Sequence, residues 1–272
     1  MISVICAAYN CEKSIERAAK SILDGTFKDI ELILIDDGST DQTAEEIKKL
    51  AASDERVRPL FNEENKGLTF SLNRGLEAAR GEYIARMDAD DFSHADRLEK
   101  QFDFLESNKN YAFCSSAARL CHDGRVYGER RFMPAPSKSD LARFCPFIHP
   151  ALMIRREAIE KIGGYNEKKY TLRCEDYDLY FRLYKENLFG YNIQDALIDY
   201  EEAPYDNSKH TPSTRLNEFA VRMRGCAAIG RPLGFFIAFK CLILIFVPKW
   251  LYFKLKNMRS ENNIYEQKDR QS

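Results

Sequence analysis

The first part of the chain alternates between short apolar runs and amphipathic stretches of helical period. Each apolar run is five or six residues long, which is typical of strands buried on both faces of a sheet. Asn10 before the first amphipathic stretch and a capping box at Ser39-Thr40-Asp41-Gln42 before the second predict two helix starts. The expected strands are Ser3–Ala8, Ile30–Ile35, Val57–Phe61 and Tyr83–Met87, and the expected helices end near Leu23, Ala52, Ala79 and Ser107.

The pattern changes after about residue 110. Two runs, Tyr111–Leu120 and Arg125–Arg131, flank Asp123-Gly124, a dipeptide typical of a tight hairpin turn. We then expect a strand at Ala151–Ile154, a short helix that ends at Gly163-Gly164, and a helix at Glu175–Glu186. Strands that alternate with helices form βαβ units. The sequence therefore predicts an α/β fold, Rossmann-like, with a mostly parallel central sheet and flanking helices.

Length and composition are those of a globular protein with one large domain and an appendage. The chain has 272 residues, of which 44% are apolar and 31% charged, and this excludes a largely disordered protein. Neither a spanning helix nor a secretory signal is expected, because no apolar run reaches about 18 residues and no basic segment precedes the apolar start. Eight cysteines without C-x-x-C spacing predict reduced thiols of a cytoplasmic protein.

Differences in polarity and charge along the sequence predict a division of the chain into four segments. Residues 1–203 form the main domain, whose two parts meet near residue 110. A polar linker follows at 204–213, then a helical tail that is apolar and basic at 214–260. Residues 261–272 are predicted to be disordered.

Charge and apolar side chains are concentrated together in the tail. Eight basic residues and no acid lie between Arg222 and Arg259, which leaves 33 basic and 42 acidic residues in the rest of the chain. This asymmetry favours an anionic membrane surface over nucleic acid as a partner. As a helix, Leu233–Val247 would measure about 22 Å, less than the ~30 Å of a bilayer core. We expect an in-plane or re-entrant helix on the inner face of the membrane; the alternative is a helix packed on the main domain or on a homodimer partner.

Acidic residues follow two of the predicted parallel strands. Such sheets bind ligands outside the carboxyl ends of their strands, where this chain has Asp36-Asp37-Gly38 and Asp88-Ala89-Asp90-Asp91. Carboxylates spaced like Asp88 and Asp90 suit a hard cation, which can stabilise a departing diphosphate; alone, such a pair is equally typical of a solvated turn. A carboxylate at Asp37 can accept a hydrogen bond from a nucleobase, or it can simply belong to a turn.

A third acidic pair, Glu175-Asp176, opens a predicted helix. Acids are favoured in a first helical turn by the helix dipole, so capping alone would explain them. The functional alternative is a general base that removes a proton from an acceptor hydroxyl. Neither a P-loop nor a G-x-G-x-x-G motif is present, so phosphate binding by those loops is excluded.

The order of these motifs resembles that of family 2 glycosyltransferases with a GT-A fold, of the bacterial surface-polysaccharide type. The resemblance covers about residues 1–200. The matching segments are Val4–Asn10, Glu31–Ser39, Asn65-Lys66-Gly67, Asn73-Arg74-Gly75, Ala79–Asp91, His149–Met153, Gly163-Gly164-Tyr165 and Glu175–Leu179.

The resemblance implies inverting transfer of a sugar from a nucleotide-sugar, with Mn²⁺ or Mg²⁺ as cofactor. It implies that the part to about residue 110 binds the donor and the part at 111–203 binds the acceptor. The implied donor-binding residues are Ala8, Tyr9, Asn10, Asp37, Lys66, Asn73, Asp88 and Ala89. Asp88 and Asp90 would hold the metal. Asp176, beside Glu175, would be the catalytic base, and His149 would contact the acceptor. Many members carry Arg where this chain has Leu72, so the cation for the diphosphate would be Arg74, Lys66 or Arg86.

The sequence leaves three classes of function open. The leading one is addition of a single hexose or N-acetylhexosamine, from a donor that is UDP-linked as in most relatives, to a hydroxyl of a lipid-linked saccharide. A Q-x-x-R-W motif, which processive relatives share, is absent. A sugar nucleotidyltransferase would need a glycine-rich, basic loop after the first strand, where Ala7–Cys11 has neither feature. A non-catalytic nucleotide-sugar-binding module would tolerate damage to the acidic motifs, which are intact.

Overall fold

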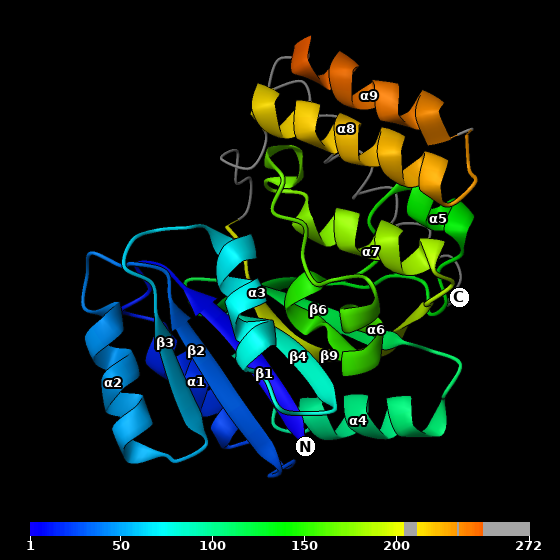
Figure 1. Ribbon diagram of the computed structural model, residues 1–272. Coiled ribbons are helices and arrows are strands. Elements are labelled where there is room, and N and C mark those ends of the chain that lie inside the picture. Colours follow the sequence, from blue (N-terminus) through cyan, green and yellow to red (C-terminus); the bar gives the residue numbers. More distant parts are fainter. Residues whose placement is uncertain (204–210, 233, 247–272) are drawn as a thin grey trace.

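The computed structural model describes residues 1–203, 211–232 and 234–246 (Figure 1). The strands are β1 (Ile2–Ala8), β2 (Ile30–Asp36), β3 (Val57–Phe61), β4 (Tyr83–Asp88), β5 (Phe92–Ser93), β6 (Phe113–His122), β7 (Arg125–Arg130), β8 (Met153–Arg155) and β9 (Gly190–Glu201). The helices are α1 (Ile15–Leu23), α2 (Thr43–Ser53), α3 (Leu68–Ala78), α4 (Arg97–Ser107), α5 (Lys138–Arg143), α6 (Arg156–Lys161), α7 (Glu175–Lys185), α8 (Pro212–Ala228) and α9 (Gly234–Phe246), with 3₁₀ turns η1 (His149–Ala151) and η2 (Lys169–Thr171).

One sheet runs through the molecule in the order β3-β2-β1-β4-β8-β6-β9-β5, with β7 paired to β6. Its first four strands are parallel, as the apolar runs predict, and the rest of the sheet is mixed. In this register Ala8 lies beside Asp36, and Ala7 lies beside Asp88. The acidic ends of β2 and β4 therefore flank the end of β1, at one edge of the sheet.

Helices cover both faces of the sheet. On one face, side chains of α1, α2 and α4 pack with Ile2, Val4 and Cys6 of β1. On the other, Ile5 packs with side chains of α3, α6 and α7. Because β1 contributes to both clusters, its side chains are apolar at nearly every position. Both faces of the sheet are buried.

The predicted tail is a pair of helices stacked on α7 (Figure 1). Gly225 of α8 lies so close to Phe181 of α7 that an added Cβ would be 2.2 Å from the ring. Arg222 is buried, pairs with Glu218 at 2.9 Å and lies over the ring of Tyr177. It is therefore not one of the free cations that the tail's composition suggests. The part of the predicted tail beyond residue 246 and the predicted disordered end lie outside the described residues.

Two predicted helix starts are wrong. The first helix begins at Ile15, and Asn10 instead has a left-handed φ of 55° and accepts hydrogen bonds from Thr40. The second begins at Thr43, and the hydroxyl of Ser39 accepts the backbone N–H of Asn10 rather than capping a helix. Both polar residues are used to join the ends of β1 and β2. The predicted linker also ends early, since α8 already begins at Pro212.

Candidate active site

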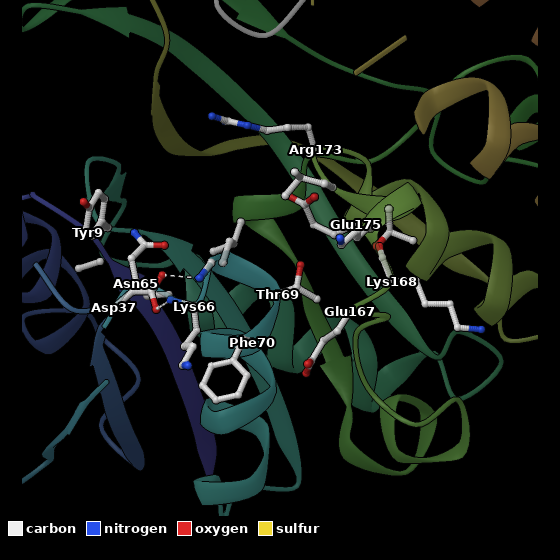
Figure 2. A pocket seen from close by; sticks show the side chains of 17 residues that line it. Tyr9, Asp37, Asn65, Lys66, Thr69, Phe70, Glu167, Lys168, Arg173 and Glu175 are labelled. Carbon is white, nitrogen blue, oxygen red and sulfur yellow. Dashed lines mark hydrogen bonds between the residues drawn. The ribbon is translucent and has the colours of Figure 1, made fainter. Parts of the chain in front are cut away.

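A cavity of about 510 Å³ lies outside the carboxyl ends of β1 and β2, between residues 7–70 on one side and residues 167–175 on the other. Its first wall comes from the ends of those strands and the start of α3, and its second from residues 167–175 (Figure 2). The lining residues are Ala7, Ala8, Tyr9, Asp37, Asn65, Lys66, Gly67, Leu68, Thr69, Phe70, Glu167, Lys168, Lys169, Thr171, Leu172, Arg173 and Glu175. The structure thus brings Ala8, Tyr9, Asp37, Lys66 and Glu175, all predicted from sequence, to one cavity.

Asp37 organises the first wall. One oxygen of its buried carboxylate accepts hydrogen bonds from the Asn62 amide at 2.6 Å, the Ser71 hydroxyl at 2.9 Å and the Lys66 N–H at 3.0 Å. Among the described residues, the other oxygen accepts only the N–H of Gly67, at 2.8 Å. An ionised carboxylate has about four acceptor positions. The second oxygen can therefore still accept a hydrogen bond from a ligand in the cavity.

A glycine lets the loop before α3 approach this wall. Gly38 has φ 68°, and a Cβ at this position would lie 2.5 Å from the carbonyl carbon of Glu64 and 2.7 Å from the nitrogen of Asn65. No side chain fits at that separation from backbone atoms. The Asp36-Asp37-Gly38 sequence thus combines a carboxylate with the close approach of residues 64–67, which carry the cavity lining.

Asn10 and Asn73 lie outside the cavity lining. Asn10, which follows Tyr9, is instead bonded to Ser39 and Thr40. The amide of Asn73 accepts the N–H of Tyr165 at 2.8 Å and donates to its carbonyl at 3.0 Å. Asn73 therefore holds the start of the second wall in place from α3.

The three acids after β4 form a negative group beside the end of β1. Partial loss of solvent around an otherwise exposed side chain, together with the charge of Asp88, raises the pKa of Asp90. Full burial, with the charges of Asp88 and Asp90, raises that of Asp91. Oδ2 of Asp91 is buried without a hydrogen-bond partner among the described residues. Ala89 is buried between the two outer acids. Carboxylate oxygens are the ligands that a hard divalent cation prefers, and the chemistry of Asp88 and Asp90 fits such an ion, with Asp91 adding a buried acceptor that no described residue satisfies.

Arg86 links these acids to the rest of the site. Its buried guanidinium pairs with Asp88, while its Nε and Nη1 have no hydrogen-bond partner among the described residues. Its positive charge also acts on Glu175 and Asp176, where it offsets part of the rise in pKa that burial causes. One buried cation therefore acts both on the acids after β4 and on the acidic pair that begins α7.

Glu175 and Asp176 begin α7 and have different surroundings. Glu175 lines the cavity, and burial together with the charge of Asp176 raises its pKa to about 7. Asp176 accepts the Tyr177 N–H at 2.7 Å and lies 3.7 Å from the Cys145 sulfur, and burial raises its pKa. Glu175, at the cavity wall, is thus tuned toward proton transfer near neutral pH, and the pKa of Asp176 is shifted in the same direction.

His149 is buried away from the cavity lining. Its Nε2 lies 2.8 Å from the hydroxyl of Tyr165, and the two rings meet edge to face. Burial, with a smaller contribution from the charge of Arg86, lowers its pKa well below the ordinary value. The imidazole is therefore neutral and belongs to the packing beneath the second wall.

Residues 167–173 of the second wall are the part of the site that the sequence did not predict. They are held by α8, since the Asn217 amide donates to the Leu172 carbonyl at 3.1 Å and Arg224 lies 4.7 Å from the Tyr170 ring. Their basic composition, with Lys168, Lys169 and Arg173 just before two acids, is the signal that could have indicated them.

Another polar group lies at the ends of β6 and β9. His122, Asp123 and Glu201 place possible ligand atoms within 4.8 Å of one another, and His122 is 3.2 Å from Glu201. The N–H of Glu201 also donates to Asp91 at 2.9 Å. Glu201 was missed because β9 was not predicted. These contacts join the β6–β7 hairpin to the acids after β4, so a structural role is sufficient to explain why the three side chains lie together.

Comparison with known proteins is consistent with this geometry. The model of the family described as glycosyl transferase family 2 matches residues 3–163. A putative glycosyltransferase of Bacillus subtilis, EpsE, is 36% identical over 249 residues, covering 91% of this chain and 90% of its own. The Escherichia coli protein WfaP, named as a UDP-Glc:alpha-D-GlcNAc-diphosphoundecaprenol beta-1,3-glucosyltransferase, is 30% identical over 73% of this chain and 75% of its own.

A solved structure shares the fold. The mannosyltransferase PcManGT of Pyrobaculum calidifontis, solved with GDP-Man and Mn²⁺, superposes with a TM-score of 0.66 at 17% identity. The match covers 98% of this chain and 82% of that one. This likeness extends over both parts of the sheet.

Proposed function

Because the chain belongs to glycosyl transferase family 2, we propose that it transfers a single hexose or N-acetylhexosamine from a UDP-sugar to a hydroxyl of a lipid-linked saccharide. The observation that carries this proposal is the cavity of about 510 Å³. It places Tyr9 and Asp37, suited to a nucleoside, opposite Glu175, an acid of the predicted catalytic pair. Family membership makes the protein a glycosyltransferase; the sugar, the base and the acceptor are part of the proposal.

The donor would lie along the first wall. Tyr9 offers an exposed ring for stacking on the base, and the second oxygen of Asp37 can accept its N–H. Ala8, the last residue of β1, also lines the cavity and accepts the Asp37 N–H at 2.8 Å through its carbonyl, and its small side chain leaves room for the donor. WfaP is named for a UDP-linked donor, which supports UDP, whereas PcManGT was solved with a GDP-linked one.

Asp88 and Asp90 would hold a Mn²⁺ or Mg²⁺ ion with the donor diphosphate. Such ions are commonly bound by one or two carboxylates together with substrate phosphates, so two protein ligands suffice. When bound, the ion neutralises charge on the departing nucleoside diphosphate. Arg86, already paired with Asp88, fixes the orientation of that carboxylate beneath the cavity.

Asp176 would act as the general base, with Glu175 beside it at the wall. The base takes the proton of the acceptor hydroxyl as its oxygen attacks the anomeric carbon. The bond between that carbon and the diphosphate breaks on the opposite side, which inverts the configuration. The raised pKa of both carboxyls makes either a stronger base than an exposed one.

A release assay distinguishes this function from the two alternatives. We expect incubation with UDP-sugars, Mn²⁺ and lipid extract from a bacterium with surface polysaccharides to release UDP. A sugar nucleotidyltransferase would instead release or consume pyrophosphate. A binding module would show a donor-dependent rise in melting temperature without any release, and either outcome would contradict the proposal.

We also propose that α9 lies on the anionic inner face of the membrane. No helix in the described part of the chain has the length and apolarity needed to span a bilayer. Phe236, Phe239 and Ile243 share one face of α9 and are 77%, 50% and 65% exposed, while Ala238 and Cys241 are buried against the protein. Lys240, also exposed, lies beside this apolar face, an arrangement typical of helices in the membrane interface.

Polar substitutions on this face should weaken membrane binding. We expect Phe236→Ser/Phe239→Ser/Ile243→Ser in the full chain to reduce co-sedimentation with anionic vesicles at least tenfold, because three inserted side chains are lost. Deleting the tail would be a poor test, since α8 holds α7 and the second wall. Val126→Ser, at an exposed position of β7, is the control. Equal binding of the triple variant, or binding indifferent to lipid charge, would contradict the assignment.

A further inference from the structure

A diphosphate in this cavity needs a basic side chain that is free to meet it. The three candidates from sequence have other contacts. The ammonium of Lys66 pairs with Glu64, and Arg74 donates to the carbonyl of Phe61 at 2.9 Å and to the Asn62 side chain. Arg86 is buried and paired with Asp88. Leu72, the position that is Arg in many relatives, is itself buried in the core.

Arg173 has the properties that these residues lack. It lines the cavity, is exposed, and makes no ion pair within the described residues. In Figure 2 its side chain extends from the loop above Glu175 along the upper side of the cavity, whereas that of Lys168 extends away from it. Arg173 and Glu175 line the same cavity, and the charge of Arg173 opposes a small part of the rise in pKa that burial causes at Glu175.

The backbone of Arg173 is in a conformation that arginine rarely adopts. Its φ is 66°, in the left-handed region that favours glycine. The residues on both sides hold it there: the Leu172 carbonyl accepts the Asn217 amide at 3.1 Å, and the Cys174 N–H donates to the Thr171 carbonyl at 2.7 Å. A residue keeps such a strained conformation only where the surrounding structure holds it there, and residues of this kind are concentrated at functional sites.

We propose that Arg173 binds a diphosphate in this cavity through its guanidinium. The inference rests on the proposed function and adds a binding residue that is not part of any acidic motif. Guanidinium matches the paired oxygens of a phosphoryl group, and charge-assisted hydrogen bonds of this kind are strong. A diphosphate can come from the donor, or from the lipid carrier of the acceptor, and the chemistry of recognition is the same for both.

Binding measurements on Arg173→Gly test the proposal without requiring turnover. Glycine tolerates the left-handed conformation, so we expect a melting temperature equal to or above that of the wild type. Affinity for a diphosphate should fall about tenfold to a hundredfold, and Arg173→Lys should recover part of it. Arg125→Gln, which removes an exposed arginine of β7 far from the cavity lining, is the matched control.

Two probe pairs identify the source of the diphosphate. Weaker binding of UDP with unchanged binding of uridine assigns Arg173 to the donor. Weaker binding of farnesyl diphosphate with unchanged binding of farnesol assigns it to the carrier. Unchanged affinity for both diphosphates, in a variant whose wild-type parent binds them, would overturn the inference. If the wild type binds neither UDP nor UDP-sugars, the proposed function fails instead.

Discussion

Replacing Asp90 by alanine is expected to abolish metal-dependent sugar transfer while the fold persists. Asp90 is exposed at the end of β4, so its loss creates no cavity and leaves no buried charge unpaired. Loss of a ligand to the ion that stabilises the departing diphosphate should lower kcat about 10²–10³-fold, by analogy with other electrostatic stabilisers. Asp88→Ala is less informative, because it would also leave the buried Arg86 without its ion-pair partner.

Mn²⁺ binding, followed by electron paramagnetic resonance in the presence of UDP, gives a readout besides activity. We expect Asp90→Ala to weaken Mn²⁺ binding and Asp103→Ala, at an exposed acid of α4, to leave it unchanged. Near-normal kcat of Asp90→Ala at saturating metal and donor would remove Asp90 from the site. Normal Mn²⁺ binding with lost turnover would contradict its role as a ligand.

The second large effect is expected for Asp176→Asn. An amide keeps the size of the side chain and its hydrogen bond from the Tyr177 N–H, but it cannot take a proton from the acceptor. We expect kcat to fall about 10²–10⁴-fold with donor affinity unchanged, as measured by single-turnover transfer and by UDP titration.

Glu175→Gln is the matched control for this variant. Glu175 is the member of the pair that lines the cavity, so the structure makes it the natural competitor for the role of base. A smaller loss in Glu175→Gln than in Asp176→Asn supports the assignment. The reverse order, with Asp176→Asn active, would exchange the two roles.

The sequence predicted those parts of the fold that depend on local pattern. The strands β1, β2 and β4 appear as apolar runs because both of their faces are buried, whereas β3, at the edge of the sheet, is only partly buried. The Asp123-Gly124 turn has the positive φ values, 48° and 74°, of a tight hairpin. By contrast, β9 was missed because its pairing with β6 shifts register near Ser116 and Ala117. Such irregularities interrupt the period-two pattern by which a strand is identified.

The candidate site likewise contains residues that the sequence predicted and residues that it did not predict. Asp37 and Asp88 were found because they directly follow strands, and a parallel sheet gathers such residues at one edge. Asn10 and Ser39 look like helix caps, yet they bond to each other across 29 positions of sequence. The position of residues 167–173 depends on α3 through Asn73 and on α8 through Asn217. Contacts of that kind leave no local pattern, so the second wall became visible only in the structure.

We expect the enzyme to add one sugar to a lipid-linked saccharide with inversion. Mass spectrometry and NMR of the product formed from α-linked UDP-hexoses or UDP-N-acetylhexosamines, Mn²⁺ and a diphosphoundecaprenol-linked sugar test this expectation. The expected product is heavier by a single sugar residue, with a β linkage. A ladder of longer products, an α linkage, or no sugar transferred from any of these donors would contradict it.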